Sequence, residues 1–170
     1  MACPKAEALE QGATSAADWG KAAVAWDDCA HSTQDACEKA EDLLRAAECV
    51  AEEANCSGAA VQQALEAERG WYLASAAKYL IECADRSFER GDLKKAVEIY
   101  HLADLVSRSA LGTLVARLAN LWQGAWKGGP EPPTNVELAQ ISDRAKDGER
   151  IATDMNENNE REREEKTLPR

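Results

Sequence analysis

The sequence predicts an all-α protein. Alanine is frequent, glycine and proline gather in a few short stretches, and the long segments between them contain neither residue. Small side chains without helix breakers are typical of helices that pack closely together. Apolar residues recur at helical spacing, and β-branched or aromatic runs that would indicate strands are few. We therefore expect an antiparallel bundle of four long helices plus a shorter C-terminal helix.

The first long helix is expected after Ser15, where tryptophans and alanines share one stripe. The second is expected after residues 32–35, because Ser32 and Asp35 resemble a capping box. It should run to about Cys56, before the stop at Ser57 and Gly58. Its predicted core face consists of Leu43, Leu44, Ala47, Val50 and Ala54.

The third helix is expected from about Ala59 to Arg90, and Gly91 ends it. Asp92 then caps a fourth helix, whose apolar positions continue as far as Trp122. That apolar surface is too wide for one neighbour, so we expect the fourth helix to lie centrally.

Consecutive glycines and prolines from 128 to 133 break the helical pattern, and Thr134 with Glu137 restarts it as a capping box. The fifth helix has a thin apolar stripe, and after Met155 the chain becomes too polar to bury anything. The predicted organisation is a helical bundle over 1–127, a Gly/Pro linker over 128–134, a C-terminal helix over 135–155 and a charged, disordered tail over 156–170. A tail that becomes helical on a partner is the alternative.

The segment from Leu80 to Ala103 resembles one tetratricopeptide repeat. The resemblance rests on Leu80, Cys83, Ala84 and Phe88 in the first helix, Gly91 at the turn, and Ala96, Tyr100 and Ala103 in the second. Small residues at such positions let two antiparallel helices approach closely. No second copy follows at a 34-residue period, which that family would require. A microtubule-interacting-and-trafficking type module is similar over the same span, and a generic helical hairpin is an equal alternative.

The resemblance implies protein or peptide binding in a groove between helices, without catalytic activity. The residues predicted to contact the partner are Tyr72, Tyr79, Tyr100 and Trp122, each with a packing role as the alternative. No catalytic triad, phosphate-binding loop or nucleophile elbow occurs in the sequence. We expect no cofactor.

The net charge of −11 repels phosphate backbones, so nucleic acid is excluded as an expected partner. No apolar run is long enough to cross a membrane, and residues 1–20 lack the features of a secretory signal. These observations favour a cytoplasmic protein, with a trimmed secreted form as the alternative. A homo-oligomer is left open.

A metal- or thiol-handling bundle that uses Glu98, His101 and the cysteines is a second hypothesis. Glu98 and His101 have the Glu-x-x-His spacing that presents two ligands from one helical turn, and Asp28 with His31 offers a second half. Neither pair lies at the centre of its helix's apolar face.

The six cysteines lack any Cys-x-x-Cys motif, which excludes a zinc ribbon or thioredoxin-like site by spacing. Cys29, Cys37 and Cys83 fall on or beside apolar faces, where thiols serve as small core residues. Cys49 and Cys56 lie opposite the predicted core face of their helix. That helix is covered on both sides, or these thiols are exposed, or they bond to cysteines elsewhere. A cytoplasmic location favours reduced thiols. The third hypothesis is a secreted helical protein that is stabilised by disulfides and acts at a cell surface.

Overall fold

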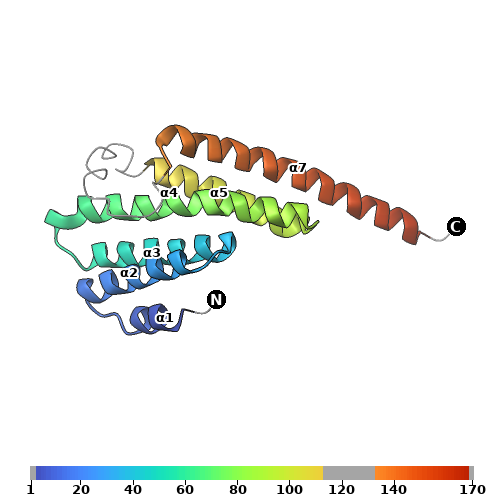
Figure 1. Ribbon diagram of the computed structural model, residues 1–170. Helices are drawn as coiled ribbons and strands as arrows, with labels where there is room; N and C mark the ends of the chain where they lie inside the picture. The colour runs from blue at the N-terminus through green and yellow to red at the C-terminus, as the bar shows by residue number, and fades with distance from the viewer. Residues whose placement is uncertain (1–2, 113–132, 169–170) are drawn as a thin grey trace.

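The computed structural model describes residues 3–112 and 133–168 (Figure 1). Within these ranges the chain is helical and contains no strand, which confirms the all-α prediction. The helices are α1 (Pro4–Gln11), α2 (Ala16–Ser32), α3 (Ala36–Asn55), α4 (Ala59–Glu89), α5 (Leu93–Gly112) and α7 (Asn135–Thr167).

Local capping residues set most helix boundaries, as predicted. The Ser15 hydroxyl accepts a hydrogen bond from the Asp18 amide at 3.3 Å, and the Asp92 carboxylate accepts one from the Lys95 amide at 3.3 Å. Gly91 has a φ of 79°, a left-handed conformation that glycine adopts without a steric penalty, and it separates α4 from α5. Thr134 and Glu137 form the predicted capping box at the start of α7.

The cap of α3 differs from the prediction. Asp35 by itself accepts hydrogen bonds from the Cys37 and Glu38 amides, at 2.9 and 3.0 Å. Ser32 belongs to the end of α2, where its hydroxyl donates to the Cys29 carbonyl at 2.8 Å. An aspartate next to the first turn reaches two amides at once, so the more distant serine is not needed as a cap.

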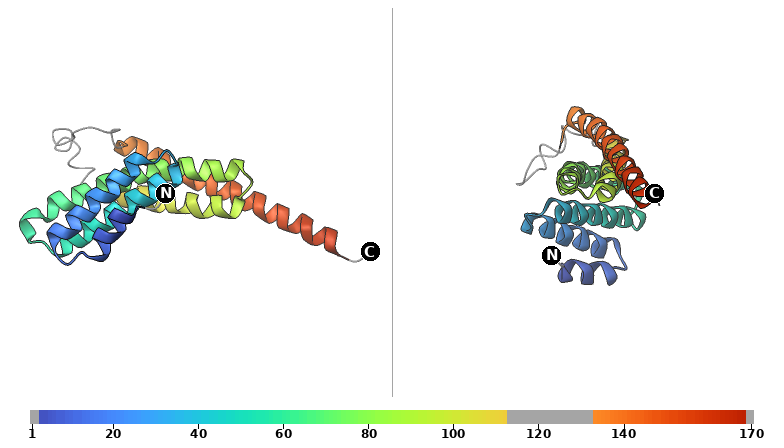
Figure 2. Two further views of the ribbon diagram at one scale, coloured as in Figure 1. Left: turned by 60° about the horizontal axis from the view of Figure 1, so that its bottom comes forward. Right: turned by 90° about the vertical axis from the view of Figure 1, so that its right-hand side faces the viewer.

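The helices form a layered stack in which each packs on its neighbours along the chain (Figures 1 and 2). The end-on view in Figure 2 shows α1, α2 and α3 as successive layers, followed by α4 with α5, and then α7. Within the described ranges the main contacts join α1 to α2, α2 to α3, α3 to α4, α4 to α5, and α5 to α7, with a smaller contact between α4 and α7. These contacts confirm an all-helical architecture but do not confirm the expected antiparallel bundle of four long helices plus a shorter one.

Alanines allow the close approach of consecutive helices. Ala84 of α4 and Ala96 and Ala103 of α5 are fully buried at the predicted hairpin. Many further core positions along α2, α3 and α4 are alanine as well. With so little volume per side chain, dense packing requires short distances between helix axes.

The C-terminal helix is longer than predicted. It spans 33 residues, and its last turns project beyond the rest of the molecule (Figures 1 and 2). Residues 156–167, expected to be disordered, continue the helix, and their side chains are exposed from residue 157 onward. Good helix formers and pairs of opposite charge explain the extension: Arg161 lies 3.9 Å from Glu157, and Lys94 of α5 lies 3.4 Å from Glu160.

Two predictions lie outside the described residues. They are the continuation of the fourth helix through Trp122 and most of the linker over 128–134.

Candidate binding groove and cavity beside helix α4

Two of the predicted contact residues, Tyr72 and Tyr100, belong to the core. Tyr72 is 4% exposed and its ring meets Trp71 edge to face, with 4.8 Å between ring centroids. Tyr100 is 5% exposed, and its hydroxyl donates to Asp85 Oδ1 at 2.7 Å. Burial raises the pKa of both phenols above the ordinary value. Neither ring offers a surface to a partner in this structure.

Tyr79 occupies a half-buried position on α4, and two lysines lie near its ring. Lys39 Nζ lies 5.2 Å from the centroid of its ring, and Lys78 Nζ lies 5.9 Å from it. Both distances fall in the range of cation–π contacts. Tyr79 is thus the predicted contact residue that remains accessible, while Trp122 lies outside the described residues.

The Tyr79 ring forms part of a partly open cavity of about 90 Å³ lined by α2, α3 and α4. Its lining combines apolar, aromatic, basic and hydroxyl side chains: Ala30, His31, Lys39, Leu43, Trp71, Ser75 and Tyr79. Of this set, only Tyr79 was predicted to contact a partner, because the lining comes from three helices; His31 was named for the metal hypothesis and Leu43 for the core.

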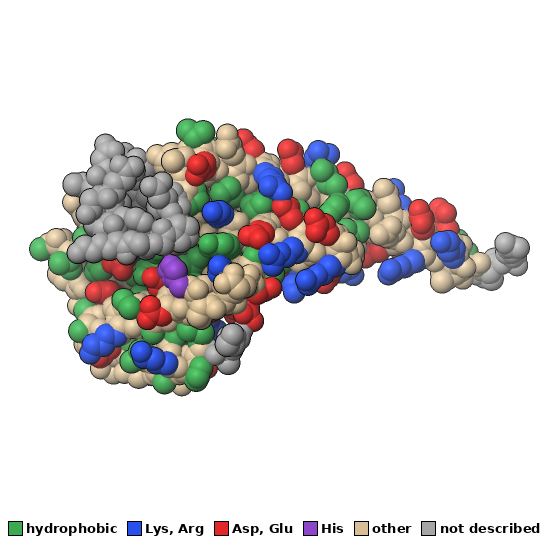
Figure 3. Space-filling model, viewed as in Figure 1, with side chains coloured by type: hydrophobic (Ala, Val, Ile, Leu, Met, Phe, Trp, Pro, Cys, Tyr) green, Lys and Arg blue, Asp and Glu red, His purple; other side chains and the backbone are tan. Residues whose placement is uncertain are grey.

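A larger groove of about 580 Å³ lies between α4 and α7. These two helices run in the same direction (Figure 1). The apolar lining residues are Ile81, Pro133 and Ile141, and the polar ones are Lys78, Glu82, Asp85, Glu137, Gln140 and Arg144. Figure 3 shows basic, acidic and apolar side chains interleaved along the boundary between α4 and α7. The groove offers apolar contact and both signs of charge.

A polar junction sets the distance between the groove walls. Asp85 of α4 accepts hydrogen bonds from Tyr100 of α5 and from Arg144 of α7. It therefore links three helices through one carboxylate. Because the Asp85 carboxylate also accepts a hydrogen bond from the buried Tyr100 hydroxyl, its ion pair with Arg144 is held in one geometry more firmly than a fully exposed pair would be.

A second junction joins α5 to α7. Asp104 is 4% exposed and accepts hydrogen bonds from Ser142 at 2.5 Å and from Arg108 at 2.8 Å. Burial acts to raise the pKa of Asp104, but these hydrogen bonds outweigh burial and hold its pKa below the usual value. The junction holds α7 against α5 and so supports α7 as the second wall of the groove.

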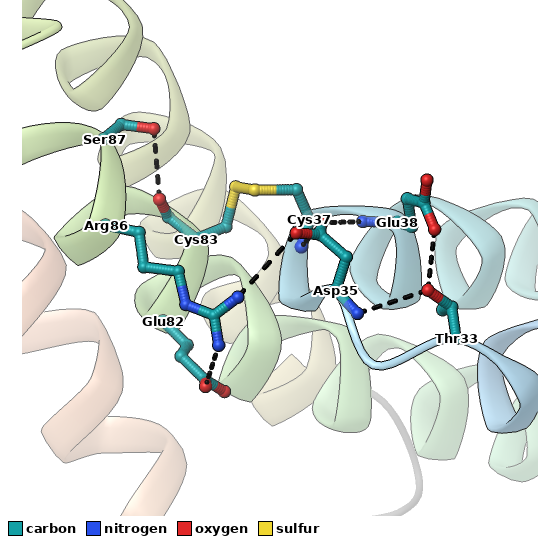
Figure 4. Close-up of polar contacts among 8 residues, drawn as sticks. All are labelled: Thr33, Asp35, Cys37, Glu38, Glu82, Cys83, Arg86 and Ser87. Carbon is teal, nitrogen blue, oxygen red and sulfur yellow. Dashed lines mark hydrogen bonds and ion pairs between the residues drawn. A yellow bond between two sulfur atoms is a disulfide. The ribbon is translucent and has the colours of Figure 1, made fainter. Parts of the chain in front are cut away.

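Helix α4, one wall of the groove, is linked to α3 by a disulfide between Cys37 and Cys83, whose Cα atoms lie 4.9 Å apart (Figure 4). Arg86, one turn from Cys83, lies 2.9 Å from Glu82 and 3.7 Å from Asp35. Figure 4 shows the disulfide and the Arg86 contacts bridging the first turn of α3 and the C-terminal part of α4. Covalent and ionic links therefore coincide at this junction.

A second disulfide joins Cys3 to Cys29, and the two free cysteines are Cys49 and Cys56. The prediction of reduced thiols is therefore wrong for four of the six cysteines. Cys29, Cys37 and Cys83 lie beside apolar faces, as expected, but those faces bring them within bonding distance of a partner. Cys49 is 1% exposed because α2 and α4 cover α3 on both sides, one of the three alternatives, whereas Cys56 is exposed.

The residues of the metal hypothesis are accessible side chains. Glu98 is exposed, and His101 Nδ1 lies 3.3 Å from Glu149 of α7. Asp28 is exposed, and His31 is paired with Asp27 instead, at 3.3 Å. Over residues 3–112 and 133–168, no group of three or more histidine, cysteine or carboxylate side chains is arranged to hold a metal ion.

Buried carboxyls are a feature that sequence reasoning missed. Asp42 of α3 is 8% exposed, and burial raises its pKa to about 6, with the Glu41 charge adding to the effect. Burial likewise raises the pKa of Asp27 and of Glu68, on α2 and α4. An acidic residue in an acidic stretch gives no sign in the sequence of whether a neighbouring helix covers it.

Comparison of the chain with protein-family models, with curated proteins and with solved structures found no match. None of the helices in the described ranges is long and apolar enough to cross a membrane.

Proposed function

We propose that the chain is a protein-interaction module that binds a peptide segment of a partner between α4 and α7, without catalytic activity. The observation that carries the proposal is the 580 Å³ groove, which has apolar side chains on both walls and charged side chains along its edges. Binding sites for peptides and small ligands are concave, with an apolar lining and a few placed polar groups.

The charges that remain available define the partner. Asp85 and Arg144 bind one another, and Glu137 is engaged in the capping box with Thr134. Lys78, by contrast, has no ion-pair partner within 4 Å among the described residues. A fitting segment places an apolar side chain against Ile81 and Ile141 and an acidic side chain beside Lys78.

The hairpin of α4 and α5 supplies the scaffold for this groove. Its buried alanines and the glycine turn are the features that resemble a tetratricopeptide repeat. We propose that the hairpin acts as such repeats do, by presenting one helix face to a partner, and that α7 replaces the next repeat as the second wall.

The test selects binders from a displayed library of random peptides against the wild-type chain. Affinity of the selected peptides is then measured by fluorescence anisotropy for wild type, Gln140→Trp and Asp154→Trp. The first substitution fills the groove from its α7 wall. The second places the same large side chain at an exposed site on α7 about 21 Å further along the helix.

We expect Gln140→Trp to weaken binding by about tenfold or more, equivalent to about 1.4 kcal/mol. Asp154→Trp should leave affinity within about twofold of wild type. Lys78→Glu should weaken those peptides that carry an acidic residue. Equal affinity for the wild type and Gln140→Trp would refute the groove as the site, and so would a selection that enriches no peptide.

The two disulfides favour a second proposal, that this is a disulfide-stabilised helical protein of an oxidising compartment such as the cell exterior. In that compartment the disulfides Cys3–Cys29 and Cys37–Cys83 would then form without added oxidant. Mass spectrometry of peptides from the natively isolated protein, alkylated before lysis, tests this. Alkylation of all six cysteines would refute it, while the peptide-binding proposal would stand.

A further inference from the structure

We infer that the partly open cavity lined by α2, α3 and α4 is a recognition site for a carboxylate group. The site is separate from the groove, because the two share no lining residue. Three observations carry the inference: a cation without a counter-ion, an aromatic lining, and a volume suited to a small group.

Lys39 provides the cation. Its ammonium lies over the Tyr79 ring at 5.2 Å and has no carboxylate within 4 Å among the described residues. The chain carries 31 acidic and 20 basic side chains, so acidic partners are in excess. A lysine that faces a cavity without an acidic partner is therefore unexpected in this protein. An anion in the cavity would supply the missing partner.

His31 and Ser75 add hydrogen-bonding capacity to the same cavity. His31 Nδ1 lies 2.8 Å from the Asp27 carbonyl oxygen and donates to it, so in the neutral ring Nε2 is an acceptor and the Ser75 hydroxyl is the neutral donor to a bound carboxylate. Asp27 carries the acidic charge that faces His31, at 3.3 Å. Lys39 is therefore the main source of positive charge, the Ser75 hydroxyl donates to the bound group, and the His31 ring forms part of the wall.

Trp71 and Tyr79 supply apolar walls, and Leu43 completes them. Trp71 is 7% exposed and belongs both to the hydrophobic core and to the cavity lining. An apolar surface beside a cation suits a carboxylate that is attached to a short hydrocarbon chain.

The volume limits the size of the ligand. An apolar cavity of about 150 Å³ binds benzene, so a cavity of about 90 Å³ accepts a smaller group. A propionate-sized group fits this limit. Both a free short-chain carboxylate and the side chain of a glutamate in a partner protein have this chemistry.

The experiment titrates the full chain with sodium propionate at constant ionic strength and follows the indole N–H resonance of Trp71 by NMR. Loss of the resonance in Trp71→Phe assigns it. Propionamide, which has the same shape without the charge, is the matched ligand control. The variants are Lys39→Gln, Lys39→Arg and, as a control at an exposed lysine on α5, Lys95→Gln.

We expect a saturable shift with propionate and none with propionamide. Lys39→Gln should weaken binding by about tenfold or more, while Lys95→Gln leaves it unchanged. Lys39→Arg, which keeps the charge, should retain binding and shows that a loss in Lys39→Gln does not reflect unfolding. An equal response to propionamide, a shift that fails to saturate, or undiminished binding by Lys39→Gln would overturn the inference.

Two peptides separate the sources of the carboxylate. If acetyl-Gly-Glu-Gly-amide binds more tightly than propionate and its glutamine counterpart does not bind, the cavity is assigned to a glutamate side chain of a partner protein. Tighter binding of propionate assigns it to a free carboxylate. Gln140→Trp should leave either result unchanged, so failure of the groove and failure of the cavity are distinguishable.

Discussion

The ring of Tyr100 lies against Gly148, and a Cβ atom on Gly148 would come within 2.6 Å of Tyr100 Cε1. This contact brings α5 and α7 together near the middle of α7. It also explains why Tyr100, which resembles a groove residue in the sequence, lies in the core: a glycine in the facing helix leaves space for the whole ring.

Gly148→Ala should destabilise the protein. Alanine favours helix over glycine by about 1 kcal/mol, but overpacking against a buried ring costs about 1–3 kcal/mol. Since α5 and α7 also share the Asp104 junction, the ring has little room to move. We expect a lower Tm by thermal unfolding, with Asp143→Ala at an exposed position of α7 as the control. A higher Tm for Gly148→Ala would show that the ring moves freely.

The pKa of Asp42, raised to about 6 by burial, predicts a stability that falls as pH rises from about 4 to 6. The folded state binds the proton more tightly than the unfolded state in this window, so deprotonation favours unfolding. Asp42→Asn should therefore be more stable than wild type at pH 7, with a Tm higher by about 2–4 °C for each kcal/mol gained.

The test compares chemical unfolding of the wild type and Asp42→Asn between pH 4 and 7. The difference should appear above pH 4 and reach its full size above pH 6. Glu48→Gln, an exposed change on the same helix, is the control for net charge. A constant difference across this range would contradict the assignment to Asp42.

The lowered pKa of Asp104 predicts the opposite pH dependence. Its charge stabilises the folded state above the ordinary value of 3.8, and this contribution is lost as pH falls through the lower folded pKa. Asp104→Asn should lose about 2 kcal/mol at pH 7, because Ser142 and Arg108 lose a charged acceptor. The deficit should shrink below pH 4. Asp143→Asn, next to Ser142 but exposed, should leave the unfolding free energy within about 0.5 kcal/mol of wild type.

Thiol reactivity should reveal one fast and one slow cysteine. Cys56 is exposed, whereas burial raises the pKa of Cys49 to about 12, so little thiolate forms there. A thiol reagent should modify one cysteine in the native protein and two after denaturation without reductant. Six reactive thiols after denaturation would contradict both disulfides.

Loss of the bond between Cys37 and Cys83 should destabilise the fold. It closes a loop with a sequence separation of 46, for which the chain-entropy model gives about 4 kcal/mol. Cys37→Ala with Cys83→Ala should therefore lower the midpoint of denaturant unfolding. Cys56→Ala, which removes an exposed free thiol, is the control, and an unchanged midpoint in the double variant would show that packing alone holds α3 on α4.

Helix boundaries follow from the sequence because their causes are local. Ser15, Asp92 and Thr134 bond to amides three residues away, and Gly91 needs only its own backbone conformation. The same local rules misjudged the end of α7, since one contact that holds its last turns comes from Lys94 of another helix.

The candidate sites could not be predicted in the same way. The groove joins Ile81 to Ile141, from helices that are not consecutive in the chain, and the cavity adds His31 of α2 to Lys39 and Tyr79 of the next two helices. Helical periodicity identifies an apolar face, but it does not say which neighbour covers that face or how completely.

The sequence by itself therefore determined that this protein is helical and where most of its helices begin and end, because hydrogen bonds within four residues decide both. Only the tertiary structure decided which tyrosines are buried, which cysteines pair and where the groove opens. Those outcomes depend on contacts such as that between Asp85 and Arg144, 59 residues apart, whose geometry is set by the packing of whole helices.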